Sequence, residues 1–107
     1  MSRVMAAAVQ AAAALLLTTS AALAQTKVPA AAQMCGPCHG ANGIATAPDA
    51  PNLAGQSAIY TGAQLKAYRS GLRKHEVMNV VAKPLSDADI DALAAWYSSI
   101  KIEVKAP

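Results

Sequence analysis

The sequence has few large apolar side chains. Phe is absent, and aromatic residues make up only 4% of the 107 residues. Cysteine occurs twice, which excludes a scaffold held by many disulfides. A single small domain of this composition buries too little apolar surface to be stable without help. The sequence therefore predicts that a covalent link or a bound cofactor completes the core.

The first 24 residues have the pattern of an export signal. A short positive start at Arg3 precedes an apolar run over residues 4–17, and Ala22-Leu23-Ala24 is a small-x-small cleavage pattern. An uncleaved membrane anchor is the alternative, but the run is short for a span of about 20 residues. We expect cleavage after Ala24, a periplasmic location in a bacterium, and a domain over residues 25–107 without a stable membrane anchor.

Charge excludes one class of partner. The net charge of +3 is too small to indicate nucleic-acid binding. Basic residues gather in the middle of the chain and three acids follow them: Lys66, Arg69, Arg73, Lys74 and Lys83, then Asp87, Asp89 and Asp91. The basic group is either an ordinary solvated surface or a patch that steers an acidic protein partner. The acids are typical of a helix start and do not resemble acid–base catalysts.

The hydrophobic pattern predicts an all-α domain. A short helix begins at Pro29 and runs to the cysteines, and residues 40–57 form a long loop rich in Gly and Pro. A helix over 58–72 has a stripe of Leu65, Tyr68 and Leu72. Residues 73–85 are expected to be irregular. No strand pattern and no repeat is present.

The last helix has the clearest boundaries. Ser86 is a good N-cap, and Asp89 stands three residues later, as in a capping box. Its buried stripe is predicted to hold Ile90, Leu93, Ala94, Tyr97 and Ile100, with Trp96 at the edge.

The chemistry is concentrated in Cys35-Gly36-Pro37-Cys38-His39. This C-x-x-C-H pattern is the attachment signature of c-type haem. Its spacing puts both thiols on one side of a turn, where they can form thioethers with the haem vinyl groups, and His39 can bind the iron. A covalent haem would also supply the apolar surface that the chain lacks.

Three other interpretations compete. The Cys-Gly-Pro-Cys spacing also occurs in thioredoxin-like oxidoreductases, but those need a βαβ context. A disulfide between Cys35 and Cys38 would close a very small loop and stabilise little. A zinc site would need more ligands than His39 and His75 provide.

A haem iron bound by His39 needs a sixth ligand or has an open site. Met34 adjoins Cys35 and cannot cross to the other face of the ring, whereas Met78 is far enough along the chain to do so. A thioether ligand raises the reduction potential. Met78 as a core residue is the alternative reading. His75 is the rival ligand, although its charged neighbours indicate an exposed position.

The chain resembles the class I c-type cytochromes, and most closely their small c553-like and single-domain c4-like bacterial members. The residues that carry this resemblance cover nearly the whole predicted mature chain: Cys35-Gly-Pro-Cys-His-Gly40, Asn42-Gly43, Pro51-Asn-Leu-Ala-Gly-Gln56, Tyr60, Gln64-Leu65, Tyr68-Arg-Ser-Gly-Leu-Arg73, Met78 and Leu85-Ser-Asp-Ala-Asp-Ile-Asp-Ala-Leu-Ala-Ala-Trp-Tyr97.

The resemblance implies a small cytochrome c fold of three to five helices around one covalent haem. It implies thioethers at Cys35 and Cys38, with His39 and Met78 as the axial ligands. It further implies that the Pro51 carbonyl accepts a hydrogen bond from His39 Nδ1, a contact that orients the ring. Leu53 and Tyr60 would lie against the haem, and Trp96 or Tyr97 would pack near Ala31 where the terminal helices cross.

The expected function is one-electron transfer and not enzymatic catalysis. Partners would be redox proteins such as a dehydrogenase, a cytochrome bc1 complex or a terminal oxidase, which meet the rim around Cys35 and Cys38. A haem subunit of one dehydrogenase or oxidase complex is the nearest alternative. A thiol–disulfide oxidoreductase and a five-coordinate, gas-binding haem protein are alternatives of other classes.

Overall fold

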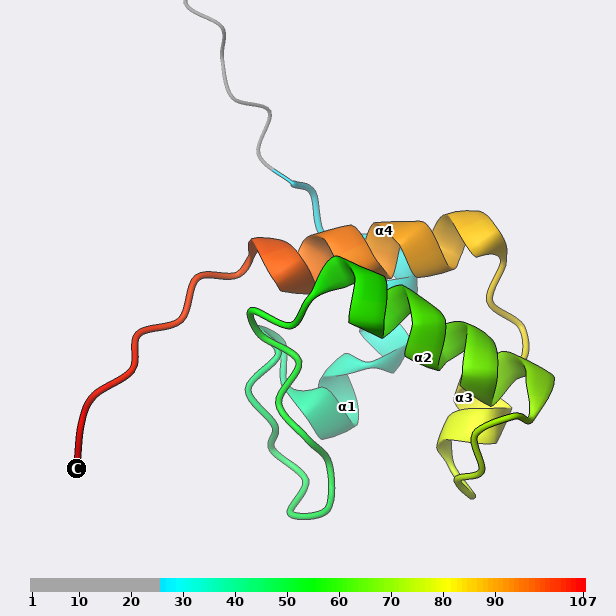
Figure 1. Ribbon diagram of the computed structural model, residues 1–107, viewed down its shortest axis with the longest axis horizontal. Coiled ribbons are helices and arrows are strands. Elements are labelled where there is room, and N and C mark those ends of the chain that lie inside the picture. Colours follow the sequence, from blue (N-terminus) through cyan, green and yellow to red (C-terminus); the bar gives the residue numbers. More distant parts are fainter. Residues whose placement is uncertain (1–25) are drawn as a thin grey trace, which may run out of the picture.

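The computed structural model describes residues 26–107, which form helices and no strand (Figure 1). This part of the chain contains a 3₁₀ helix and four α-helices: η1 (Ala30–Met34), α1 (Gly36–His39), α2 (Ala58–Ser70), α3 (Met78–Ala82) and α4 (Asp87–Ser99). The all-α prediction is confirmed. The predicted signal peptide and its cleavage after Ala24 lie outside the described residues. No helix over residues 26–107 has the length and apolar character needed to cross a membrane.

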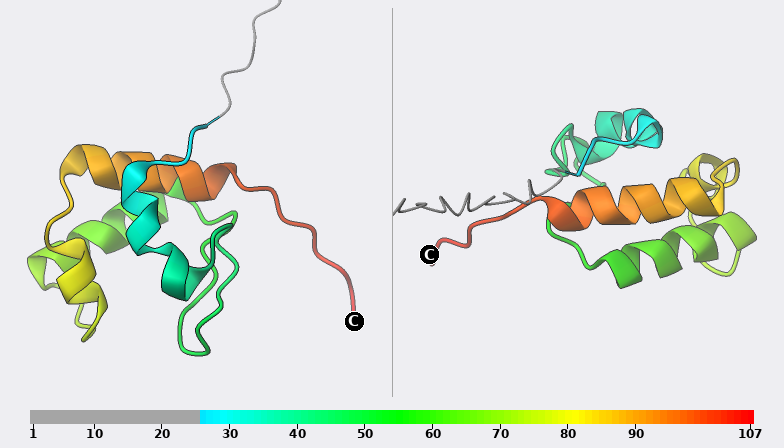
Figure 2. Two further views of the ribbon diagram at one scale, coloured as in Figure 1. Left: turned by 180° about the vertical axis from the view of Figure 1, so that it is seen from behind. Right: turned by 90° about the horizontal axis from the view of Figure 1, so that it is seen from above.

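Helix α4 lies at the centre of the fold. It runs beside α2 in the opposite direction, while η1 and α1 lie along its other side (Figure 2). Helix α3 packs against α2 near the end where α2 stops (Figure 1). The loop over residues 40–57 leads from α1 to α2, as predicted. The short helices α1 and α3 therefore lie apart from each other, and the long helices α2 and α4 connect them.

The core is built on the predicted face of α4. Ile90 and Leu93 are fully buried, and Tyr97 is 2% exposed. Ala31 and Trp96 are partly buried against this core, and η1 packs on α4, which agrees with the crossing that the resemblance implies. Core side chains are few and small, so most of the apolar packing of this domain depends on α4.

The start of α4 follows the local sequence signal. The Ser86 hydroxyl accepts a hydrogen bond from the Asp89 N–H, and the Asp89 carboxylate accepts one from the Ser86 N–H, both at 3.0 Å. This capping box satisfies two backbone donors that the first turn of a helix leaves free. The prediction of an N-cap at Ser86 is confirmed.

The predicted stripe of α2 is wrong at its last residue. The helix ends at Ser70 because Gly71 adopts a left-handed conformation with a φ of 82°. The chain then turns away, and Leu72 is 88% exposed instead of lying beside Leu65 and Tyr68.

The prediction that residues 73–85 are irregular is wrong in part, because this segment contains α3. The His75 imidazole Nδ1 accepts hydrogen bonds from the N–H groups of Val77 and Met78, at 3.2 and 3.1 Å. A histidine in this role is not a sequence signal for a helix start, and five residues are too few to show a helical period.

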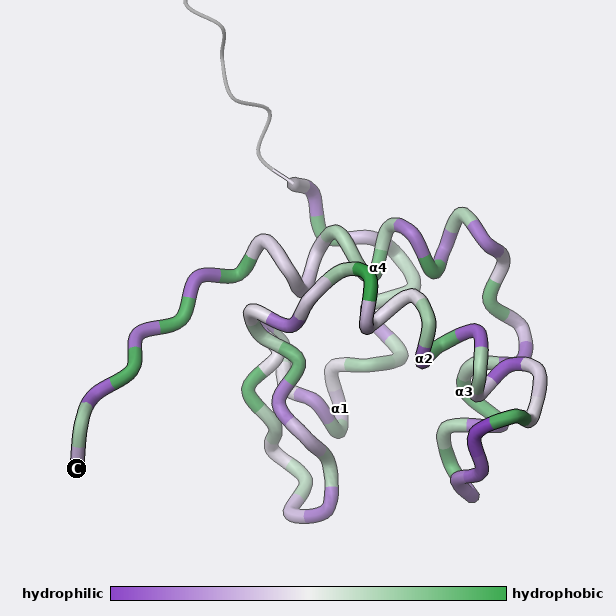
Figure 3. Tube along the Cα trace, viewed as in Figure 1, coloured by the Kyte–Doolittle hydropathy of each residue, from purple (hydrophilic) through white to green (hydrophobic). Residues whose placement is uncertain are grey.

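The C-terminal residues 101–107 are exposed and have no regular structure. Hydrophobic and hydrophilic residues alternate along them, and they extend away from the helices (Figure 3). They contribute nothing to the cavity described next.

Candidate cofactor site

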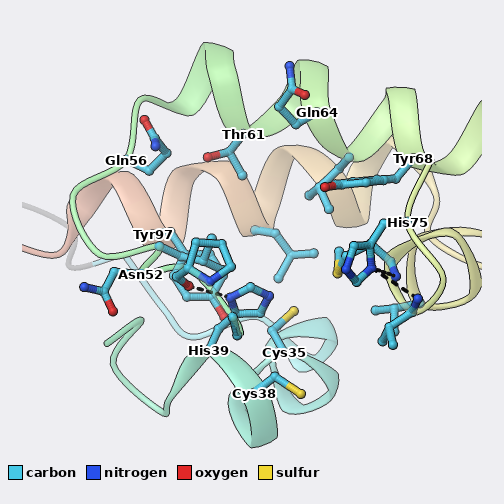
Figure 4. Close-up of a pocket in the computed structure, with 18 of the residues that line it drawn as sticks. Cys35, Cys38, His39, Asn52, Gln56, Thr61, Gln64, Tyr68, His75 and Tyr97 are labelled. Atoms are coloured by element: carbon cyan, nitrogen blue, oxygen red, sulfur yellow. Dashed lines mark hydrogen bonds between the residues drawn. The ribbon is translucent and has the colours of Figure 1, made fainter. Parts of the chain in front are cut away.

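One helical turn positions the C-x-x-C-H side chains. Cys35 is the N-cap residue of α1, and the His39 N–H donates to the Cys35 carbonyl at 2.9 Å. The turn brings Cys35, Cys38 and His39 to one side of a cavity (Figure 4). Cys35 is half-buried, Cys38 is exposed and His39 is buried, and the two cysteines form no disulfide.

The ring of His39 is held by a contact from the long loop. Its Nδ1 lies 2.8 Å from the carbonyl oxygen of Pro51, which can only accept a hydrogen bond (Figure 4). In the neutral ring Nδ1 therefore carries the proton, and Nε2 keeps a lone pair. A neutral imidazole oriented in this way is the form that binds a metal. This is the contact that the resemblance implies for Pro51.

The cavity has a volume of about 440 Å³. Residues of all five helices line it, and η1 contributes only its last residue, Met34. Its apolar lining includes Leu53, Leu65, Val81 and Leu93. Leu53 and Tyr60, both named from the resemblance, border it, and Tyr60 is 49% exposed at its edge. Two thiols, one oriented imidazole and apolar walls are what a covalently attached porphyrin requires, so the residues present fit a haem.

Met78 and His75 both reach this cavity from the side of α3. Met78 is the first residue of α3 and is half-buried, while His75 is exposed. The Nδ1 atom of His75 already accepts the backbone N–H groups of Val77 and Met78. The structure thus brings Met78 into one cavity with His39, although helix α2 and a long loop separate them in the chain.

Asn79 is a further residue that sequence reasoning missed. Its side-chain oxygen accepts the His75 N–H at 2.7 Å, and its NH₂ group donates to the carbonyls of Tyr68 and Arg73, each at 2.8 Å. These bonds tie α3 to the end of α2. No sequence signal marks Asn79, because its partners are set by the packing of two helices.

Tyr97 was predicted as a core residue, and it is also part of the cavity lining. Burial raises the pKa of the Cys35 thiol, and a hydrogen bond with Tyr97 partly opposes this. Burial also raises the pKa of the Tyr97 hydroxyl, and the nearby Cys35 raises it further. Both groups are therefore protonated at neutral pH.

The competing interpretations of the cysteines find no support over residues 26–107. This part of the chain has no strand, so the βαβ context of a thioredoxin-like site is missing. It also has no group of three His, Cys, Asp or Glu residues that could hold a zinc ion.

Residues 26–101 match the family model for cytochrome c. Cytochrome c-554(548) of Halomonas halodenitrificans is 50% identical over 68 residues, which cover 61% of this chain and 82% of the relative. The thiosulfate dehydrogenase electron acceptor of Thiomonas intermedia is 40% identical over 102 residues, or 94% of this chain and 45% of the relative.

The fold matches a solved structure as well. The crystal structure of reduced recombinant cytochrome c4 from Pseudomonas stutzeri is 36% identical, with a TM-score of 0.59, and the match covers 63% of this chain and 38% of that one. This chain thus spans less than half the length of the cytochrome c4 and thiosulfate dehydrogenase acceptor relatives that it matches. The family match, the C-x-x-C-H turn and the helical cavity lead to one conclusion: the chain belongs to the cytochrome c family, with covalent haem c as its cofactor and electron transfer as its role.

Proposed function

We propose that this protein is a one-electron carrier with a single haem c in the cavity between α1, α2 and α3. Cys35 and Cys38 would hold the haem by thioether bonds, and His39 and Met78 would be its axial ligands. The observation that carries this proposal is the placement of all four side chains around one cavity. When bound, the haem supplies the reversible change of one electron at its iron.

Residues of the chain would orient the axial ligand, set the reduction potential and exclude water from the haem. Pro51 holds the His39 ring in one orientation and one tautomer. The thioether of Met78 favours ferrous iron and so raises the reduction potential. Leu53, Leu65 and Leu93 line the cavity with apolar side chains, which would keep water from a bound haem. With both axial positions occupied by side chains, no substrate reaches the iron, so we propose a carrier and not an enzyme.

Electrons would pass through the exposed rim near Cys38 to a protein partner. The segment over residues 28–48, which carries both cysteines, contains no Asp, Glu, Lys or Arg, and Met34 and Ile44 in it are half-exposed. Such a surface suits brief apolar contacts, while the basic side chains Arg73, Lys74 and Lys83 are exposed on the side of α3. Two relatives are named as electron acceptors of thiosulfate dehydrogenase, which supports a dehydrogenase as the class of donor.

We place this carrier in the periplasm, after cleavage of residues 1–24. The support is the leader pattern in the sequence, together with haem attachment through cysteines, which suits an exported protein. A haem subunit of a fixed complex remains the second candidate function, because it would use the same site.

The test is the visible absorption spectrum of the full chain, expressed in a bacterium that matures haem c. A c-type α band in the reduced protein, and the weak long-wavelength band of methionine-ligated ferric haem, are expected. Cys35→Ser with Cys38→Ser should abolish covalent attachment. A colourless, correctly processed protein would overturn the proposal. Sedimentation then separates a free monomer from a subunit that co-purifies with a second polypeptide.

A further inference from the structure

Thr61 has a buried hydroxyl without a partner. The residue is 8% exposed, and its Oγ1 makes no hydrogen bond within residues 26–107. A helical threonine usually donates its hydroxyl to the carbonyl one turn earlier. Here the carbonyl of Ser57 accepts the Thr61 backbone N–H at 2.9 Å but not the hydroxyl. Burying such a group is unfavourable unless something else in the folded protein bonds to it.

The Thr61 side chain belongs to the cavity lining. Figure 4 shows it beneath α2, across the cavity from Cys35 and Cys38. The indole nitrogen of Trp96 is also buried without a partner, but Trp96 does not line the cavity. Of these two groups, only the Thr61 hydroxyl can meet a bound cofactor.

Three amide side chains border the same cavity, and each uses its oxygen elsewhere. Asn52 Oδ1 accepts a backbone N–H at 2.7 Å, and Gln56 Oε1 accepts one at 2.9 Å. Gln64 Oε1 accepts from the Arg73 guanidinium at 2.7 Å. Each amide is thus left with its NH₂ group, which only donates. Asp49 is the one carboxylate of the lining, and it is exposed. The other charged or titratable side chains of the lining, besides the cysteines, His39 and Tyr97, lie toward the end of α2 and the start of α3, apart from Tyr60 at the cavity edge: they are Tyr68, Arg73 and His75.

This part of the lining therefore presents hydrogen-bond donors, and a bound group with acceptor oxygens would satisfy them. A haem carries its two propionate carboxylates on the edge opposite the two vinyl groups that form thioethers. If Cys35 and Cys38 hold the vinyl edge, the propionates would lie on the side away from the cysteines, and Thr61 and Gln56 lie across the cavity from Cys35 and Cys38 (Figure 4). We propose that Thr61, with the amide of Gln56, forms a carboxylate subsite in which the Thr61 hydroxyl donates a hydrogen bond to a haem propionate.

The subsite has a measurable consequence, and it rests on the proposed haem site. A donor stabilises the ionised propionate and so lowers the pKa of that propionate. Ionised propionate stabilises ferric haem, so the reduction potential changes with pH where the propionate titrates. Without the hydroxyl, this pH-dependent region moves to higher pH.

The experiment compares holoprotein variants Thr61→Val and Thr61→Ser. Valine keeps the shape and removes the hydroxyl, while serine keeps the hydroxyl. Thr61→Val should shift the pH-dependent region of the potential upward and move the propionate bending band in the resonance Raman spectrum. Thr61→Ser should leave both close to wild type. Thr61→Ala provides a second hydroxyl-free variant if valine lowers the yield, and Thr26→Val, at an exposed position outside the cavity lining, is the matched control.

The two proposals fail in different ways. If the wild-type protein shows neither the c-type α band nor the methionine band, the proposed haem site is wrong. If both bands are present, and the hydroxyl-free variants keep the wild-type pH profile and Raman band, the Thr61 subsite alone is wrong.

Discussion

The Nδ1 atom of His39 donates a hydrogen bond of 2.8 Å to the carbonyl oxygen of Pro51. This bond joins the helical turn of the cysteines to the long loop, and it decides which ring nitrogen faces the cavity. The pyrrolidine ring of Pro51 restricts its own φ, so the acceptor is part of a stiff segment. The orientation of the proposed proximal ligand is thus set by backbone geometry and does not depend on a second titratable side chain.

The assignment of Met78 as the distal ligand predicts a spectroscopic loss. Met78→Ala should remove the long-wavelength band of ferric haem completely and lower the reduction potential, because a soft ligand for ferrous iron is gone. Met34→Ala is the control, since Met34 adjoins Cys35 and should leave both unchanged. Absorption spectra and redox titration of the holoproteins measure this. An unchanged band in Met78→Ala would indicate that another residue binds the iron.

The hydrogen bonds of Asn79 predict that this residue stabilises the Met78 segment. Asn79→Ala removes three bonds to His75, Tyr68 and Arg73. Leaving their backbone groups without partners should cost about 1–3 kcal/mol. In a guanidinium titration, the methionine band should then disappear at a lower denaturant concentration than in wild type.

Val80→Ala is the matched control for this experiment, because Val80 lies on the same short helix and is 71% exposed. If both variants lose the band at the wild-type concentration, the Asn79 bonds do not hold the Met78 segment.

Two glycines of the haem-attachment turn should respond differently to alanine. Gly40 has a φ of 80°, and a Cβ there would overlap the carbonyl oxygen of Ile44. Gly36, between the cysteines, has no atom within 4 Å of such a Cβ. Gly40→Ala should therefore cost more than about 1 kcal/mol and reduce the yield of holoprotein, while Gly36→Ala should be tolerated. Thermal unfolding checks this, and equal midpoints for the two variants would contradict it.

The ion pair between Arg69 and Asp87 predicts a pH dependence of stability. The Arg69 guanidinium, 2.6 Å away, lowers the pKa of the Asp87 carboxyl below its ordinary value. A carboxyl with a lowered pKa in the folded state contributes stability above its unfolded pKa and loses it as the pH falls. Wild type should exceed Asp87→Asn in stability at neutral pH, and the difference should vanish in acid.

Urea unfolding at a series of pH values measures this difference. High salt should reduce it, because the pair is exposed and screened. Asp91→Asn, on an exposed position of the same helix, serves as the control. A difference that persists at low pH would show that the carboxylate charge is not its cause.

Local signals in the sequence predicted the parts of this protein that depend on near neighbours. The C-x-x-C-H turn spans five consecutive residues, and the capping box of α4 spans four, so each is complete within one stretch of chain. The buried face of α4 followed from its helical period. These features need no partner from elsewhere, which is why α4 and the attachment turn could be predicted.

Tertiary structure decided the rest, because it depends on residues that meet only when α1, α2 and α3 pack around the cavity. The partners of Asn79 and the unpartnered hydroxyl of Thr61 have no local signature. A pattern of residue types specifies which side chains face inward along one helix, but distances between helices follow from packing, and these distances decide which inward side chains share a site.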